Sequence, residues 1–175
     1  MSPVRDYGTT NISNGMRIVV LSDTHMPRTA EDLPAGVYKE IDASDMIIHA
    51  GDFIEIEVLN KLRKLKPTRA VCGNMDSQVI RNELRQKDIV AIGKFKIGLI
   101  HGYGAPAGLV DTVASEFIGV DAIVFGHTHS PVNISKNGVL FFNPGSPTDT
   151  VFAKINSFGI LEVTDDAIEG KIIQL

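Results

Sequence analysis

The sequence predicts an α/β fold with a mainly parallel sheet first and antiparallel strands in the last third. Three observations lead to this prediction. Short runs of branched apolar residues alternate with amphipathic stretches, which is typical of β-α-β units. An Asn-Gly pair separates two later apolar runs, as in a β-hairpin. Polar side chains suited to metal binding follow several of the runs.

Residues 1–15 are predicted to form a loose N-terminal arm, because they are rich in Gly, Ser, Thr and Asn and lack an apolar period. A segment folded over the sheet is the alternative. Residues 16–175 are predicted to form a single domain, since no linker-like composition divides them.

The strands are predicted from continuous apolar runs, which are characteristic of buried strands. In order they cover residues 17–21, 46–49, 70–72, 89–92, 96–101 and 122–125. Helices are predicted for residues 55–65 and 108–117. In the first, Val58, Leu59, Leu62 and Leu65 share one face. Two hairpins are predicted for the last third, from residues 133–135 with 139–142 and from residues 158–164 with 168–173.

Composition excludes several classes of protein. The 175 residues include 17 basic and 21 acidic side chains, and the net charge of −4 argues against a general nucleic-acid binder. The single cysteine, Cys72, cannot form an intrachain disulfide. We found no apolar run long enough to span a membrane and no signal peptide, so the expectation is a cytoplasmic protein without membrane partners.

Seven polar residues share one position in the pattern, because each follows the end of an apolar run. They are Asp23, His25, Asp52, Asn74, His101, His127 and His129. The carboxyl ends of parallel strands meet at one edge of a sheet, and ligands bind at that edge. The sequence therefore predicts that these side chains converge.

These residue types suit divalent ions such as Mn, Fe, Zn or Ni. Seven ligands exceed the four of a closed zinc site and suit two ions that share a carboxylate. Taken alone, Asp23-x-His25 is more often a chance pair, and Gly51-Asp52 and Gly73-Asn74 are common turns. The prediction depends on all the motifs occurring together, each after a run that predicts a strand.

The ordered motifs resemble the calcineurin-like metallophosphoesterase family, and the short chain resembles its small bacterial and archaeal phosphodiesterases, which lack a cap domain. The resemblance extends from about Met16 to the C-terminus, and Asn143-Pro144-Gly145-Ser146 also matches this branch. It implies a four-layer α-β-β-α sandwich with mixed sheets. It also implies a homodimer or homotetramer.

The resemblance also implies roles for the seven residues. Asp23, His25 and His129 resemble the ligands of one ion, and Asn74, His101 and His127 those of a second. Asp52 matches the bridging carboxylate, and Asn74 could also orient a substrate phosphate. The implied reaction is hydrolysis of a phosphodiester by in-line attack of a hydroxide shared by two ions, with Mn the first expectation and Ni, Fe, Zn or Co also possible.

The sequence departs from the broad family at Met75, where many members have a histidine that assists the leaving group. Methionine cannot donate a proton, so we predict a preference for activated diesters. Met75 could instead line an apolar wall for the substrate. Arg28 could reach a substrate phosphate, although a solvated arginine fits its position equally well.

Two further residues are predicted to support the site. Asp76 either orients a neighbouring group or caps the following helix. His49 could support Asp52 from behind, or it could be an ordinary core histidine. There are two alternatives to a phosphodiesterase of small substrates: a non-enzymatic protein-interaction scaffold on the same fold, and a nuclease. We read the only basic cluster (Lys61, Arg63, Lys64 and Lys66) as a solvated surface, so no stable nucleic-acid binding is expected.

Overall fold

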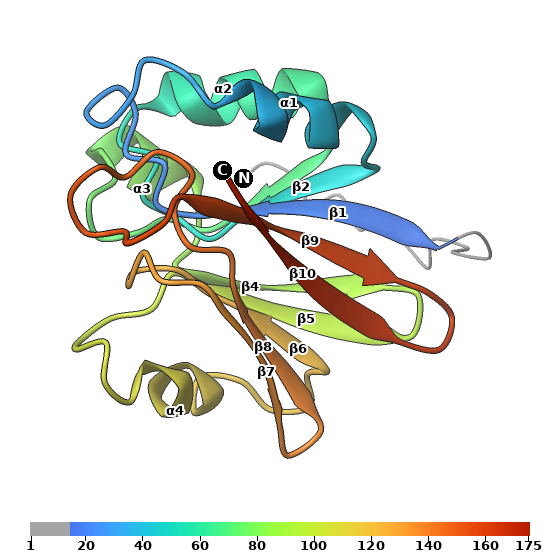
Figure 1. Ribbon diagram of the computed structural model, residues 1–175. Helices are drawn as coiled ribbons and strands as arrows, with labels where there is room; N and C mark the ends of the chain where they lie inside the picture. Colours follow the sequence, from blue (N-terminus) through green and yellow to red (C-terminus); the bar gives the residue numbers. More distant parts are fainter. Residues whose placement is uncertain (1–14) are drawn as a thin grey trace.

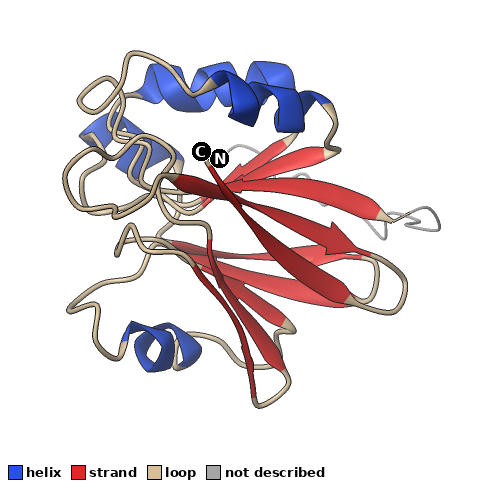
Figure 2. Cartoon of the chain, in the orientation of Figure 1, coloured by secondary structure: helices blue, strands red, loops and turns tan. Residues whose placement is uncertain are grey.

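The computed structural model describes residues 15–175, which form four layers (Figure 1). Two five-stranded sheets face each other, with α1 (Ala35–Asp42) and α2 (Ile56–Leu65) over the first and α4 (Leu109–Ala114) over the second (Figure 2). The predicted α-β-β-α sandwich is confirmed. Apart from Gly15, the predicted N-terminal arm lies outside the described residues.

The first sheet is mixed, and three parallel strands lie at one side of it. Its spatial order is β10 (Ile168–Gln174), β9 (Ser157–Val163), β1 (Met16–Leu21), β2 (Met46–His49) and β3 (Thr68–Ala70). Strands β1, β2 and β3 are parallel, and β9 and β10 extend the sheet in antiparallel pairs. The carboxyl ends of β1 to β3 therefore lie at the same edge.

The second sheet follows the same principle, with a parallel centre and antiparallel flanks. Its order is β4 (Lys87–Ile92), β5 (Phe95–Ile100), β6 (Ala122–Val124), β8 (Val139–Asn143) and β7 (Val132–Lys136). Strands β5, β6 and β8 are parallel, while β4 and β7 are antiparallel to their neighbours. Strands β5 and β6 therefore also end at a common edge.

The two antiparallel hairpins predicted for the last third are confirmed, and the structure adds two features that the sequence did not predict. Strands β4 and β5 form an antiparallel hairpin, because only two residues separate them and no crossover helix can fit. The last four strands also divide between the sheets, since β9 pairs with β1 and β8 pairs with β6, in parallel. Apolar runs report burial but do not specify the neighbouring strand.

Smaller differences concern individual elements. Leu65, predicted on the apolar face of α2, is 39% exposed because it lies at the last residue of that helix. The strand predicted for residues 70–72 ends at Ala70, because the Cys72 N–H turns away from β2 and donates to the Arg85 carbonyl. Helices α1 and α3 (Gln78–Glu83) were not predicted. Each buries too few residues to produce a helical period, since α3 buries only Ile80. The hairpin at Asn137 and Gly138 is confirmed, with positive φ angles of 52° and 79°.

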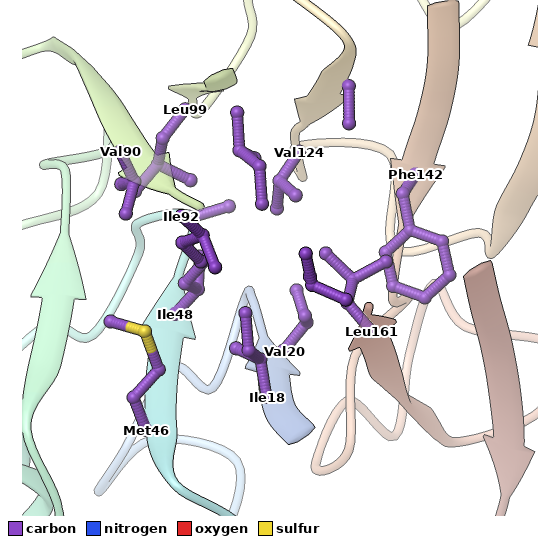
Figure 3. Close-up of a cluster of buried hydrophobic side chains, with 14 of the residues drawn as sticks. Ile18, Val20, Met46, Ile48, Val90, Ile92, Leu99, Val124, Phe142 and Leu161 are labelled. Carbon is purple, nitrogen blue, oxygen red and sulfur yellow. The ribbon is translucent and has the colours of Figure 1, made fainter. Parts of the chain in front are cut away.

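The core explains why β1 is apolar throughout. Ile18 and Val20 point between the two sheets, where they pack in a cluster with Leu99 and Phe142 (Figure 3). Their neighbours Val19 and Leu21 point the opposite way, toward the cluster that α1 and α2 cover. A third cluster lies between the second sheet and α4. Among the residues described, no helix is both long enough and apolar enough to cross a membrane.

Candidate metal centre

All seven predicted ligands lie in loops at one edge of the molecule, toward the left in Figure 1. Asp23 and His25 follow β1, Asp52 follows β2, and Asn74 follows β3. The second sheet contributes His101 after β5 and His127 and His129 after β6. Both sheets thus deliver side chains to the same place, as the sequence predicted.

The donor atoms of the first group surround Asp23. Its Oδ1 lies 3.3 Å from His129 Nε2 and 3.7 Å from His25 Nε2. These three residues form one of two groups whose ligand atoms all lie within 4.8 Å of one another. The other group is Asp23 with Asp52 and His101. Asp23 therefore belongs to both.

Asp52 connects the first group to the remaining donors. Its Oδ2 lies 3.5 Å from His25 Nε2 and 3.3 Å from His101 Nε2. Beyond His101, Asn74 Oδ1 lies 3.1 Å from His101 Nε2 and 3.1 Å from His127 Nδ1. The seven side chains form a continuous cluster, which we call the ligand row, with Asp52 near its middle.

Two atoms of the ligand row show that its residues fit a cation. Among the described residues, Asp23 Oδ1 and His25 Nε2 are buried side-chain atoms without a hydrogen-bond partner. Leaving a buried polar atom unpaired costs about 1–3 kcal/mol. A divalent ion would satisfy both atoms, and carboxylate, imidazole and amide oxygen donors suit such an ion.

The backbone at the ligand row is strained. Five of the seven ligands have positive φ angles, between 45° and 71°, which only glycine adopts freely: Asp23, His25, Asp52, His127 and His129. Each such residue costs on the order of 1–3 kcal/mol, and such strain clusters at functional sites. Here it directs the side chains of several loops toward one point.

A close approach explains the glycine before Asn74. A Cβ atom on Gly73 would lie 2.1 Å from Asp52 Oδ1 and 2.6 Å from the backbone nitrogen of Asp52. Any side chain at position 73 would therefore displace Asp52. The Gly-Asn pair is a packing requirement here as well as a turn.

Asp76 holds the loops of Asp52 and Asn74 together. Its carboxylate accepts hydrogen bonds from the backbone N–H groups of Asp52, Phe53, Ile54 and Gly73, at 2.6–3.1 Å. Burial raises the pKa of Asp76, although these N–H groups act in the opposite direction. Its side chain does not cap α3, whose N-cap is Ser77, so the capping alternative is wrong and orientation of a neighbouring group remains.

His49 is fully buried and touches two of the ligand loops. Its Nδ1 accepts the Gly51 N–H, 3.1 Å away, which fixes the turn before Asp52. Its Nε2 lies 3.2 Å from Thr24 Oγ1, and its ring stacks on Phe53. Burial lowers the pKa of His49 to about 3, so the ring is neutral. The residue is both a core histidine and a support for Asp52.

The sequence reasoning missed Asp149. This buried carboxylate forms a short hydrogen bond with Nδ1 of His129, which leaves Nε2 of that ring facing Asp23. Outer carboxylates of this kind orient metal-binding histidines. Asp149 follows β8, which ends at the same edge as β6 because the two strands are parallel. A correct prediction of that pairing would have identified it.

Two other predicted residues are exposed and lie close in the sequence to members of the ligand row. Met75 is 42% exposed, and its N–H donates to Asp52 Oδ1 at 2.7 Å. Arg28 is exposed, in the loop that follows His25. Because both side chains are exposed, each is accessible to a substrate, as predicted. Neither residue belongs to the ligand row.

The charges in the ligand row predict that metal binding strengthens as the pH rises. Burial opposes protonation of His101, but Asp52 and Asp23 raise its pKa to about 9. Burial likewise opposes protonation of His129, whose pKa Asp23 and Asp149 raise to about 9. Both rings hold protons below that pH and must release them to bind a metal. The apparent affinity for Mn²⁺ should therefore rise between pH 6.5 and 8.5.

Calorimetric titrations at pH 7 in buffers of different ionisation heat measure this proton release directly. A binding heat that does not depend on the buffer would contradict the assignment of His101 and His129 as protonated ligands. His49 should not contribute to this proton release, because its pKa of about 3 leaves the ring neutral at pH 7.

A cleft of about 610 Å³ lies elsewhere, between β3 and β4. It includes Met16 and Met46, which begin β1 and β2, and Ile89 of β4. These are the amino ends of the parallel strands, away from the ligand row. The chemistry of the donors, and not cavity size, locates the candidate site.

Comparison with known proteins identifies the family of this chain. A family model described as a calcineurin-like phosphoesterase superfamily domain matches residues 16–166. A probable metallophosphoesterase from Methanocaldococcus jannaschii is 38% identical over 163 residues, which cover 91% of this chain and 82% of that protein.

Solved structures share the fold. The structure of a novel archaeal phosphodiesterase matches with a TM-score of 0.69 at 26% identity, and the match covers 91% of this chain and 100% of that chain. Vacuolar protein sorting 29 from Cryptosporidium parvum has a TM-score of 0.73 at 24% identity, covering 92% and 98%, and shows likeness of fold alone. The family model spans most of the sequence and the ligand row lies within it, so the chain belongs to the calcineurin-like phosphoesterase superfamily.

Proposed function

We propose that this protein hydrolyses small phosphodiesters with two divalent metal ions. The observation that carries the proposal is the continuous ligand row, in which Asp52 lies between two sets of donors and Asp23 Oδ1 lacks a partner. When bound, two such ions supply a hydroxide nucleophile near neutral pH and charge that stabilises the phosphoryl oxygens. Mn is the first candidate, followed by Ni, Fe, Zn and Co.

The protein's own groups attract the ions and position the substrate. Burial would raise the pKa of Asp23, but the neighbouring imidazole rings, His129 above all, hold it well below its usual value. The carboxylate therefore stays ionised at any physiological pH. Asn74 is exposed, and its amide N–H groups are free to donate to a phosphate oxygen while its Oδ1 faces the histidines. Arg28 would add a cation at the rim.

Met75 supports a preference for diesters with good leaving groups. It stands beside Asn74 and cannot donate a proton to a departing oxygen. General acid assistance is commonly worth about 10²–10⁴ in rate. Without it, the enzyme should favour leaving groups that are stable as anions.

Ion pairs on α2 support small substrates over nucleic acids. Lys61 pairs with Asp32 at 2.6 Å, and Arg63 pairs with Glu83 at 2.8 Å. Much of the positive charge in the basic cluster is thereby neutralised before a polyanion could bind. We therefore propose no stable nucleic-acid binding. From the sequence and the family resemblance, we also propose a cytoplasmic location and a homodimer or homotetramer.

The direct test is metal analysis of protein purified without chelator, followed by assay with bis(4-nitrophenyl) phosphate. We expect up to two divalent ions per chain and hydrolysis that EDTA stops and Mn²⁺ restores. Faster hydrolysis of 4-nitrophenyl phosphate would indicate a monoesterase. Protein that binds no divalent ion and stays inert with Mn²⁺, Ni²⁺ and Co²⁺ would exclude the proposed function.

A further inference from the structure

The loop after β8 places two large apolar side chains in solvent beside the ligand row. Val151 is 74% exposed and Phe152 is 75% exposed. The Phe152 ring lies 5.8 Å from the His129 ring, centroid to centroid, with the two planes at 84°. Exposed apolar side chains at the rim of a polar site are typical of ligand-binding surfaces.

Asp149 links the position of this loop to the ligand row. Its carboxylate binds Nδ1 of His129 and also accepts the N–H groups of Val151, Phe152 and Ala153, at 2.7–3.2 Å. One buried carboxylate therefore orients a metal ligand and anchors the backbone that carries Phe152. The backbone that carries the aromatic ring is thus anchored before any substrate arrives, which lowers the entropic cost of using the ring.

We propose that Phe152 is a specificity-determining residue that binds a planar aromatic group attached to the substrate phosphate. The inference rests on the proposed function, because it assumes that a phosphate binds at the ligand row. Phe152 touches only the edge of that row, so its exposed surface is available to a group bonded to that phosphate. A simple aryl group and a nucleobase share the required chemistry, since both present a flat π-face.

A second exposed apolar side chain, Met75, supports the same substrate class. It follows Asn74 in the sequence, whereas the Phe152 ring lies beside His129, so two exposed apolar side chains neighbour different members of the ligand row. A phosphodiester carries two organic groups. Each could find an apolar neighbour, with the aromatic one at Phe152.

The test compares three phosphate ligands by calorimetry with the Mn²⁺-loaded protein: methyl phosphate, phenyl phosphate and adenosine 5′-monophosphate. The phosphate is common to all three, so differences report on the attached group. We expect phenyl phosphate or the nucleotide to bind at least about fivefold more tightly than methyl phosphate, the low end for stacking on an aromatic side chain. A preference for the nucleotide identifies a nucleobase site, and a preference for phenyl phosphate alone identifies an aryl site.

The Phe152→Ala variant should bring the aromatic and methyl ligands to nearly equal affinity, whereas Phe152→Tyr should retain the preference. Ile118→Ala is the matched control, because Ile118 is 97% exposed and lies before β6, outside the ligand loops. A preference that survives Phe152→Ala would overturn the inference. Equal weakening of all three ligands would overturn it too, since that would indicate a structural effect on His129.

The outcomes separate this inference from the proposed function. If methyl phosphate, phenyl phosphate and the nucleotide all bind the unchanged protein equally well, the phosphate site stands and the role of Phe152 is wrong. If no phosphate ligand binds the metal-loaded protein, the proposed function fails and the inference fails with it.

Discussion

Replacing Asp52 with asparagine should remove metal binding and lower the rate of diester hydrolysis by at least about 10²–10³-fold, the cost of removing a key electrostatic group. Asp52 Oδ2 lies within 3.5 Å of both His25 and His101, so it contributes to both halves of the ligand row. Asparagine has the same shape but no charge. Metal analysis and steady-state assays with an aryl diester measure the effect.

The apo form of Asp52→Asn should remain folded. The amide oxygen can still accept the Met75 N–H, and asparagine tolerates the positive φ of 62° at this position. Asp111→Asn is the matched control, because it removes one carboxylate charge at a side chain that is 73% exposed, in α4. Unchanged turnover in Asp52→Asn would show that Asp52 is not a metal ligand.

Replacing Gly73 with alanine should both destabilise the protein and disable the metal centre. The new methyl group would overlap Asp52 at its carboxylate and at its backbone nitrogen, 2.6 Å away, and the backbone cannot turn aside as a side chain can. Overpacking of this kind costs about 1–3 kcal/mol. For a domain of this size, that loss lowers the melting temperature by roughly 2–12 °C.

Gly36→Ala provides the control for this substitution. A Cβ there would meet only Leu175 Cδ2, at the ordinary contact distance of 3.5 Å, and alanine favours the α1 helix. We expect its melting temperature to equal or exceed that of the unchanged protein. If Gly73→Ala keeps its metal and its melting temperature, the loop of Asp52 is more adaptable than the structure indicates.

The sequence predicted the ligand row because chemistry and topology coincide there. A residue such as Asp52 can be recognised from its position after a strand, since parallel strands share the edge at which they end. Asp149 follows a strand too, but β8 was predicted only as part of a hairpin. Its parallel partner β6 lies earlier in the chain, before β7, and the local sequence pattern does not indicate that pairing.

The same reason limits the prediction of the fold. Apolar runs located most strands to within two residues, because burial on both faces leaves a continuous signal such as that of β1. They did not divide the strands between two sheets, since residues in β5 and β9 are buried in the same way. That division depends on contacts between distant parts of the chain, which a single sequence does not display.

The three apolar clusters that hold the layers together contain none of the seven ligand residues. In evolutionary terms, the ligand residues can change while the residues that stabilise the fold are retained. A lineage could lose His25 or His127 and with it the chemistry, yet still inherit a rigid double sheet with a polar edge for other uses. The same separation allows a few substitutions to restore a lost site, because the loops that position its side chains remain part of the folded domain.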